Sequence, residues 1–232
     1  MLDFSRFKFL TFDCYGTLID WESGILAALR PVLAAQRINV NEDELLVRYA
    51  QHETEVEAGP YRRYRDVLTE VVVRLGRDYD FAPTDVEQRS LAESIRNWQP
   101  FPDTISALQR LANRYSLVIL SNIDDDLFAL TQPKLKVNFT DVITAQQVRS
   151  YKPARRNFET ALQRIAHDKA EVLHVAQSLF HDVEPAHALG IATAWINRRK
   201  DKEGPGATPP SSARPDATFA TLAELATATE FE

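Results

Sequence analysis

The sequence is poor in cysteine: Cys14 is the only one among 232 residues. A single thiol excludes an internal disulfide framework and fits a reducing compartment, so we expect a cytoplasmic protein. Cys14 directly follows Asp13 at the end of an apolar run, and alternation along a strand turns neighbouring side chains to opposite sides. We therefore predict a buried structural thiol rather than a catalytic one at this position.

Long apolar runs and an excess of positive charge are also absent. No stretch approaches the roughly 20 apolar residues that cross a membrane, and the first residues lack the charged-then-apolar layout of a signal peptide. The 27 basic and 33 acidic residues give a net charge of -6, which disfavours nucleic acid or an anionic membrane as a partner. A small anionic substrate is still compatible with this charge, because a local pocket can be basic on an acidic protein.

What is present is the composition of an ordinary globular protein, 44% apolar and 26% charged. Short apolar runs alternate with helical periodicity, which predicts an α/β fold with a Rossmann-like, mostly parallel sheet flanked by helices. The expected strands are residues 8–13, 117–121, 141–144, 172–176 and 191–196, with a weaker one at 217–219. The expected helices of this part are residues 104–115, 154–166 and 183–189, the second with Pro153 in its first turn and the last closed by Gly190. Residues 200–215 are rich in Gly, Pro and Ser and are predicted to form a flexible loop.

Residues 20–97 show helical patterns only. Asn41 with Glu44, and Thr84 with Glu87, are typical capping boxes, and Gly76 is expected to end a helix. We predict that residues 20–97 form a helical cap domain inserted after the first strand, while residues 1–19 and 98–232 form the Rossmann-like core. Tyr61, Tyr64 and Arg65 either line the pocket from a cap helix or, as is commoner for aromatics at helical spacing, belong to its core.

Several of the predicted strands end in polar residues. Asp13 ends the first one and precedes a turn with Gly16, which exposes a carboxylate where backbone N–H groups gather. Ser121-Asn122 and Gln177-Ser178 stand at the ends of two others, and ligands of open parallel sheets bind at these carboxyl ends. A carboxylate is ionised at neutral pH and can act as a nucleophile, although a strand-terminal Asp taken alone is more often a turn or cap residue.

Four segments carry a resemblance to a known family. The string Phe12-Asp13-Cys14-Tyr15-Gly16-Thr17-Leu18-Ile19-Asp20 resembles the first motif of the haloacid dehalogenase superfamily, in which the first Asp is the nucleophile. Ser121-Asn122, Lys152 in Ser150-Tyr151-Lys152-Pro153, and residues 174–182 are similar to the second, third and fourth motifs, in the same order. Residues 195–198 resemble a segment of the type II, L-2-haloacid dehalogenase branch.

The resemblance implies a hydrolase acting on carbon–halide bonds. Asp13 would displace halide from the α-carbon of a small 2-haloacid, and water would hydrolyse the resulting aspartyl ester to a 2-hydroxyacid. Lys152 would keep Asp13 ionised, Thr17 and Ser121 would donate hydrogen bonds to the nucleophile or the substrate, and Asp182 would orient Lys152 or the water. The substrate-binding residues implied are Tyr15, Leu18, Asn122, Gln177 and Ser178. Relatives of this kind are often dimers, so a homodimer is expected.

Two positions bear on metal use. Phosphatases of the superfamily carry a second Asp two residues after the nucleophile, where this chain has Tyr15, and a metal-binding Asp in the fourth motif, where it has Gln177. A neutral amide is a poor ligand for a hard cation, so we expect neither a metal nor another cofactor. Asp124, Asp125 and Asp126 lie near Ser121 in sequence and leave a weak Mg²⁺ site open.

Other positions depart from the dehalogenase pattern around the leaving group. Phe158 replaces a Tyr, Gln177 and Leu179 replace Ser and Asn, and His181 replaces a Trp. The early arginine that the family uses near the halide has no clear equivalent among Arg30, Arg37, Arg48, Arg62, Arg63 and Arg65. His181 either activates the ester-hydrolysing water or is a half-buried residue packed on the cap. The alternatives left open are the same aspartyl-ester chemistry on a non-halogenated carboxylate such as a strained ring, a phosphatase with a degenerate Mg²⁺ site, and a non-catalytic relic of the fold.

Overall fold

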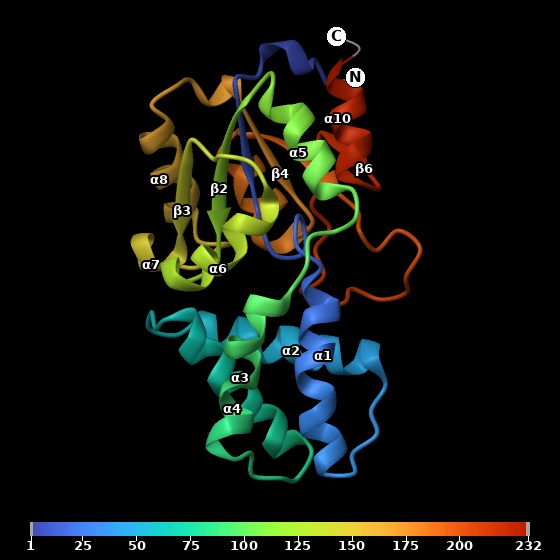
Figure 1. The fold of residues 1–232 in the computed structure, drawn as a ribbon. Coiled ribbons are helices and arrows are strands. Elements are labelled where there is room, and N and C mark those ends of the chain that lie inside the picture. The colour runs from blue at the N-terminus through green and yellow to red at the C-terminus, as the bar shows by residue number, and fades with distance from the viewer. Residues whose placement is uncertain (1, 231–232) are drawn as a thin grey trace.

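A six-stranded parallel sheet forms the core of one of the two parts of the protein, whose residues 2–230 are described by a computed structural model (Figure 1). The strand order is β3-β2-β1-β4-β5-β6, and the predicted α/β fold class is confirmed. The strands are β1 (Phe9–Phe12), β2 (Ser116–Ser121), β3 (Asp141–Thr144), β4 (Val172–Ala176), β5 (Ala192–Ile196) and β6 (Ala217–Phe219). Each of the six predicted strands is present, and each end lies within one residue of the prediction.

Both faces of the sheet are covered, as a parallel sheet requires. On β2, Leu117 and Ile119 belong to one buried cluster and Val118 and Leu120 to the other, because side chains alternate along a strand. The first cluster includes side chains from α5 (Thr104–Ala112) and α10 (Leu222–Glu230), and the second includes those from α8 (Arg155–Ile165) and α9 (Glu184–Ala188). Cys14 is fully buried in the first cluster, as predicted.

Between β1 and α5 the chain forms four helices, α1 (Trp21–Ala35), α2 (Glu42–Glu57), α3 (Tyr64–Asp78) and α4 (Asp85–Ser94), followed by the short turn η2 (Ile95–Asn97). We call α1–α4 the four-helix segment. It lies beyond the end of the sheet where β1 gives way to α1 (Figure 1). Asn41 caps α2, and Thr84 with Glu87 forms a reciprocal capping box on α4.

The remaining elements are short helices and turns on the sheet side. They are η1 (Phe4–Arg6), α6 (Asp125–Leu135), α7 (Ala145–Val148), η3 (Lys169–Glu171) and the π-helical turn η4 (Leu179–Val183). Sequence patterns did not predict α6 or α10. In α6, Pro133 and three consecutive Asp residues hide the apolar stripe, and in α10 alanine and threonine give only a weak one.

Several finer predictions are corrected by the structure. Gly76 does not end α3, which continues to Asp78. A Cβ at this position would lie 2.7 Å from the carbonyl oxygen of Phe81, so glycine permits a close approach here. Pro153 precedes the N-cap Ala154 instead of opening α8. The predicted helix 183–189 begins earlier, as η4 followed by α9.

The loop of residues 200–215 is partly packed into the protein. Ala207 is fully buried and its backbone N–H donates to Glu22 Oε1 at 3.1 Å. Arg199, just before the loop, is 8% exposed and pairs with the same Glu22 carboxylate. The middle of this loop is therefore anchored to the start of α1.

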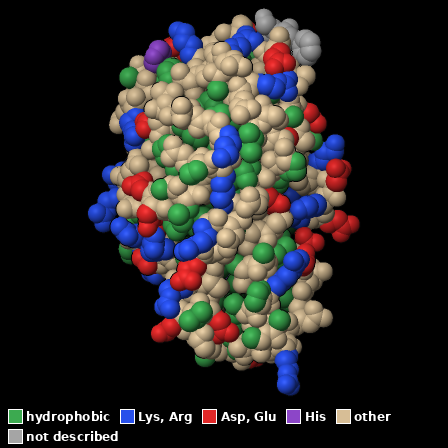
Figure 2. Space-filling view, in the orientation of Figure 1, with side chains coloured by type: hydrophobic (Ala, Val, Ile, Leu, Met, Phe, Trp, Pro, Cys, Tyr) green, Lys and Arg blue, Asp and Glu red, His purple; other side chains and the backbone are tan. Residues whose placement is uncertain are grey.

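The surface visible in Figure 2 carries positive and negative side chains interspersed with hydrophobic ones. Among residues 2–230, no helix is both long and apolar enough to span a membrane.

Candidate active site

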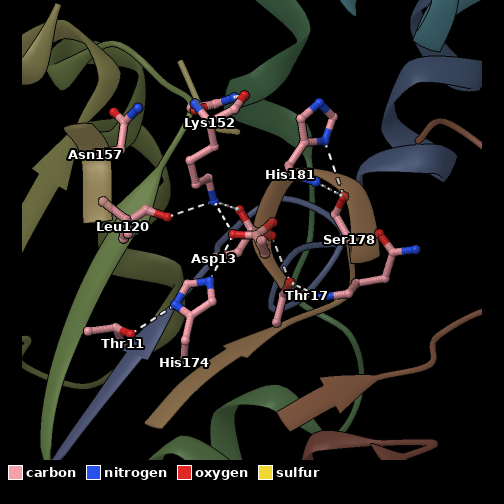
Figure 3. Close-up of polar contacts among 12 residues, drawn as sticks. Thr11, Asp13, Thr17, Leu120, Lys152, Asn157, His174, Ser178 and His181 are labelled. Carbon is pink, nitrogen blue, oxygen red and sulfur yellow. Dashed lines mark hydrogen bonds and ion pairs between the residues drawn. The ribbon is translucent and has the colours of Figure 1, made fainter. Parts of the chain in front are cut away.

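The Asp13 carboxylate lies at the carboxyl end of β1 and is held through both of its oxygens (Figure 3). Oδ2 accepts a hydrogen bond from Thr17 Oγ1 at 2.7 Å, and Oδ1 accepts one from Lys152 Nζ at 2.9 Å. The chain turns back at Gly16, whose φ of +96° favours glycine. A Cβ there would lie 2.8 Å from Trp21 Nε1, so the turn that brings Thr17 beneath Asp13 has no room for another residue.

Lys152 is buried, with 2% of its surface exposed, and its ammonium has three acceptors. Nζ donates to Asp13 Oδ1 at 2.9 Å, to Asp182 Oδ1 at 2.7 Å and to the carbonyl oxygen of Leu120 at 2.9 Å. The backbone of Lys152 is fixed by Asn122, which accepts from its N–H at 2.8 Å and donates to its carbonyl at 3.0 Å. Asn122, expected to bind substrate, thus holds Lys152 in place and also lines the cavity.

Behind Asp182 lies a polar chain that sequence patterns did not single out. His174 Nε2 is 2.9 Å from Asp182 Oδ1, and His174 Nδ1 is 2.8 Å from Thr11 Oγ1. Because an ionised carboxylate only accepts, Nε2 carries the donated proton. Thr11 and His174 are direct neighbours in register across β1 and β4. A histidine in the middle of an otherwise apolar strand was the available signal for this contact.

These charges shift one another's pKa values. Burial alone would raise the pKa of Asp182, but the Lys152 ammonium and the His174 hydrogen bond outweigh it and lower the pKa to about 2. Burial raises the pKa of Asp13 while Lys152 opposes that effect. Burial would lower the pKa of Lys152, but the two carboxylates hold it above its usual value. The ammonium is therefore a permanent charge shared by two acidic groups.

A small cavity of about 40 Å³ opens onto Asp13. Its lining brings together both halves of the molecule and consists of Asp13, Tyr15, Trp21, Glu53, Glu57, Tyr64, Ser121, Asn122, Lys152, Ser178, His181, Asp182 and Thr208. Ser121 is 3% exposed, and its buried hydroxyl has no hydrogen-bond partner among the described residues. That hydroxyl is free to bind a substrate.

The other residues expected from the sequence are distributed as follows. Ser178 Oγ accepts from the His181 N–H at 2.9 Å and lies 3.2 Å from His181 Nδ1. Tyr15 bonds Thr131 through its hydroxyl, at 2.8 Å. Gln177 and Leu18 are not among the residues that line the cavity. The Gln177 N–H donates to Thr17 Oγ1 at 2.9 Å, and Leu18 is fully buried in the hydrophobic core. The backbone of Gln177 therefore positions Thr17, and Leu18 contributes to the hydrophobic core. The substrate-binding roles expected for Gln177 and Leu18 have no support in this arrangement.

Burial fixes the charge of His181. It lowers the pKa of the imidazole to about 4, although Asp182 opposes the effect. The ring is therefore neutral at neutral pH. In that state it has a nitrogen able to accept a proton.

Two glutamates on α2 reach the same cavity and were not anticipated. Glu53 is 3% exposed, and its Oε1 accepts from the hydroxyls of Tyr49 at 2.7 Å and Tyr64 at 2.6 Å. Glu57 Oε2 accepts from Asn122 Nδ2 at 3.3 Å, whereas its buried Oε1 has no partner among residues 2–230. Glu53 falls on the apolar stripe of α2 between Tyr49 and Val56. A charged residue on that stripe was the feature of the sequence that could have indicated a buried functional carboxylate.

Burial dominates the pKa of both glutamates. It raises the pKa of Glu53 to about 7, against the hydrogen bonds from Tyr64 and Tyr49. It raises the pKa of Glu57 well above the usual value, with Glu53 adding to the effect. Burial in the empty cavity therefore favours the protonated form of both carboxyl groups.

The acidic residues after Ser121 do not face the cavity. The Asp124 carboxylate accepts from the backbone N–H groups of Tyr64 at 2.9 Å and Arg65 at 3.1 Å, at the start of α3. In the described part of the chain, no group of three or more His, Cys, Asp or Glu side chains is arranged to hold a metal ion. Metal-independent chemistry remains a prediction from the sequence.

No arginine lines the cavity. Arg30 pairs with Glu42, Arg48 with Glu44 and Asp78, and Arg65 with Asp124 and Asp126. The positive charge near Asp13 therefore comes from Lys152.

Comparison with known proteins bears on this arrangement. The family model described as "haloacid dehalogenase-like hydrolase" matches residues 7–190. This chain belongs to that family. The hydrolase is 26% identical over 231 residues to a (S)-2-haloacid dehalogenase of Pseudomonas putida, covering 93% of each chain. It is 28% identical over 205 residues to a (S)-2-haloacid dehalogenase of Pseudomonas sp. strain YL, covering 82% of this chain and 83% of that one.

Solved structures agree on the fold of the hydrolase. The L-2-haloacid dehalogenase of Xanthobacter autotrophicus with chloropropionic acid covalently bound superposes with a TM-score of 0.79 at 21% identity, covering 97% of this chain and 98% of that one. The resemblance to the superfamily and to its L-2-haloacid dehalogenases is confirmed. At this identity the likeness concerns the fold, and the roles of individual residues stay proposals.

Proposed function

We propose that this hydrolase cleaves carbon–halide bonds of small 2-haloacids, with Asp13 as a covalent nucleophile. The observation that carries the proposal is the Asp13 carboxylate at a cavity, bound through Oδ1 to Lys152 and through Oδ2 to Thr17. Two hydrogen bonds fix the plane of the carboxylate and leave lone pairs on both oxygens for attack. The haloacid dehalogenases to which the chain is similar, one of them with chloropropionic acid covalently bound, support the same chemistry.

In the first step one Asp13 oxygen attacks the α-carbon. The new C–O bond forms as the carbon–halogen bond breaks, and the halide leaves with the bonding electron pair. The ammonium of Lys152 favours the ionised form of Asp13 between substrate turnovers, against the effect of burial. The free Ser121 hydroxyl is the donor that meets the substrate carboxylate.

In the second step water hydrolyses the aspartyl ester. Once Asp13 is esterified it no longer carries a charge, and Lys152 keeps Asp182 as its ionised partner at 2.7 Å. His181 lines the cavity with a neutral ring, and we assign it the removal of a proton from the attacking water. Ser178 orients that ring, and His174 orients Asp182.

The four-helix segment completes the cavity, since Trp21, Glu53, Glu57 and Tyr64 line it opposite Asp13. On this ground we propose that residues 20–97 act as a cap domain over a core of residues 1–19 and 98–232. Catalysis without a metal, a cytoplasmic location and a homodimer stay predictions from the sequence.

A single turnover in ¹⁸O-labelled water tests the proposal. Excess enzyme is mixed with 2-chloropropionate, and the peptide containing Asp13 is analysed by mass spectrometry. Water that attacks the ester leaves one labelled oxygen in Asp13, and the first product carries an unlabelled hydroxyl. Label in the product but not in Asp13 would mean direct attack by water and would reject the ester route.

Matched variants and a chelator complete the test. Asp13→Asn should release no chloride, whereas Asp201→Asn, an exposed aspartate of the 200–215 loop, should behave as the wild type. Chloride release should be unchanged by excess EDTA, and its complete loss would contradict metal-independent chemistry.

A further inference from the structure

The cavity has an unusual balance of charge. Four carboxyl groups line it, those of Asp13, Glu53, Glu57 and Asp182, against the single ammonium of Lys152. That ammonium is already shared between Asp13 and Asp182. Apart from Lys152, the lining of the cavity contains no ammonium or guanidinium that could pair with Glu53 or Glu57.

Hydrogen bonding divides the two glutamates. Glu53 Oε1 is satisfied by two tyrosine hydroxyls, which fix its position against α3. Glu57 has one weak donor, Asn122 at 3.3 Å, and a buried oxygen with none in the described structure. A buried acceptor without a donor costs about 1–3 kcal/mol, so Glu57 Oε1 is the atom most in need of a ligand.

Ser121 supplies a second and independent sign of a missing ligand. Its hydroxyl is buried, unpartnered among residues 2–230 and lines the same cavity. It stands at the end of β2, whereas Glu57 stands at the end of α2. A ligand between them contacts a hydroxyl on the sheet side and a carboxylate on the helix side.

We propose that the substrate of this hydrolase is a small 2-substituted carboxylic acid that also bears a protonated amine, and that Glu57 binds the ammonium. The proposal rests on the function proposed above and adds the substrate class. The ammonium supplies donors to Glu57 Oε1 and a positive charge that forms an ion pair with the ionised Glu57 carboxylate. A substrate with only a carboxylate would instead add a fifth acidic group to the cavity, in which no arginine is present.

Protonation does not weaken this assignment. Burial raises the pKa of Glu57 in the empty site, and an entering ammonium favours the ionised carboxylate by the same electrostatics. The rival role for Glu57 is a neutral carboxylic acid that donates a hydrogen bond to an anionic substrate. A glutamine retains donor capacity but loses the negative charge, so Glu57→Gln separates the two roles.

The test compares two substrates of nearly equal shape, 2-chloro-3-aminopropanoate and 2-chlorobutanoate, in which an ammonium takes the place of a methyl group. Chloride release, corrected for enzyme-free release, gives kcat/KM for each. Wild type should prefer the amine at least tenfold. Glu57→Gln should lose that preference because kcat/KM falls at least tenfold more for the amine than for 2-chlorobutanoate, and Glu57→Asp should retain part of the preference.

The control is Glu55→Gln on the same helix. Glu55 is half exposed and pairs with Arg74, and it does not line the cavity, so its preference should match the wild type. Thermal unfolding of every variant checks that the fold is retained. Binding of the unreactive pair 3-aminopropanoate and butanoate, measured by calorimetry, gives a second readout that does not require turnover.

The outcomes separate the two proposals. Equal or better turnover of 2-chlorobutanoate by wild type, unchanged in Glu57→Gln, would overturn the assignment of Glu57 and leave the proposed function standing. Tighter binding of 3-aminopropanoate that depends on Glu57, without chloride release from either substrate, would support the amine subsite and overturn the proposed reaction. Neither binding preference nor chloride release would overturn both.

Discussion

Replacing Lys152 by methionine removes the only ammonium in the cavity while keeping the length of the side chain. Asp13 and Asp182 then face each other across a buried space without a shared cation, and the carbonyl oxygen of Leu120 loses its donor. We expect lower stability at neutral pH and loss of the nucleophile, because one of the two carboxyl groups takes up a proton to avoid an unpaired buried charge.

The magnitude follows from the distances. At 2.9 and 2.7 Å, an effective dielectric constant of about 20 gives about 6 kcal/mol of gross attraction for each pair. Desolvation of the three groups cancels much of this, and removing one partner of a buried pair costs about 3–5 kcal/mol. Because protonation of a carboxyl group limits the penalty, we expect about 3 kcal/mol of lost stability. If the same energy is lost from the ionised nucleophile, kcat/KM at pH 7 falls at least 100-fold.

Urea unfolding and kcat/KM are measured between pH 4 and 9. The stability difference between wild type and Lys152→Met should shrink toward pH 4, because protonated carboxyl groups no longer need the ammonium. The acid limb of kcat/KM should move to higher pH, since removal of the ammonium leaves the effect of burial on Asp13 unopposed. Lys169→Met is the control, because Lys169 is exposed and donates only to the carbonyl oxygen of Leu189. A variant with wild-type kcat/KM and an unmoved acid limb would refute the electrostatic role of Lys152.

Three further predictions concern separate parts of the molecule. In His181→Ala the Asp13 ester should accumulate, seen by intact-mass spectrometry as a carboxyalkyl adduct with a burst of chloride; a burst without adduct would contradict water activation by this residue. Burial raises the pKa of Glu53 from 4.5 to about 7, so ionisation of Glu53 destabilises the folded state increasingly as the pH rises from 4.5 to 7, and fully above pH 7. The free energy of unfolding of Glu53→Gln, relative to wild type, should therefore be up to about 3 kcal/mol higher at pH 8 than at pH 4 in urea unfolding. A pH-independent difference would show that burial does not raise the pKa of Glu53 in this way. Thr84→Ala removes the capping box with Glu87 and should cost about 1 kcal/mol, with unchanged kcat/KM; a loss of activity would place this cap in the catalytic machinery.

The sheet was predictable because burial on both faces leaves short apolar runs that polar residues end, such as 117–120 and, interrupted only by His174, 172–176. The nucleophile loop was predictable for the same reason, since Asp13, Ser121 and Gln177 mark three neighbouring carboxyl ends. That Asp13 and Lys152 meet, 139 positions apart, followed from the resemblance to a family. No local pattern in the sequence predicts a contact between residues so far apart in the chain.

What the sequence did not reveal depends on contacts between elements. Asn122 was expected at the substrate, but its amide closes two hydrogen bonds onto the backbone of Lys152. His174 looked like part of a strand, and its role appears only when register places it beside Thr11. Glu53 and Glu57 required knowing which face of α2 meets the sheet. That face is set by how the four helices pack, and periodicity within one helix shows only that a face exists.

The two sides of the cavity consequently differ in how their carboxyl groups are paired. On the sheet side, Asp13 and Asp182 share the ammonium of Lys152, which is also tied to the backbone at Leu120. On the helix side, Glu53 accepts hydrogen bonds from Tyr49 and Tyr64, but no lysine or arginine of the described chain forms a salt bridge with Glu53 or Glu57. A substitution at Glu57 can therefore change what the cavity accepts while leaving the Asp13–Lys152–Asp182 ion pairs intact, since Glu57 bonds Asn122 at 3.3 Å and none of these three side chains. The ion pairs of Asp13 and the glutamates of α2 lie on different elements, so the rate of reaction and the choice of substrate can vary separately. Substitution of Glu57 should change the ratio of kcat/KM between two substrates. Substitution of Lys152 should lower kcat/KM for every substrate.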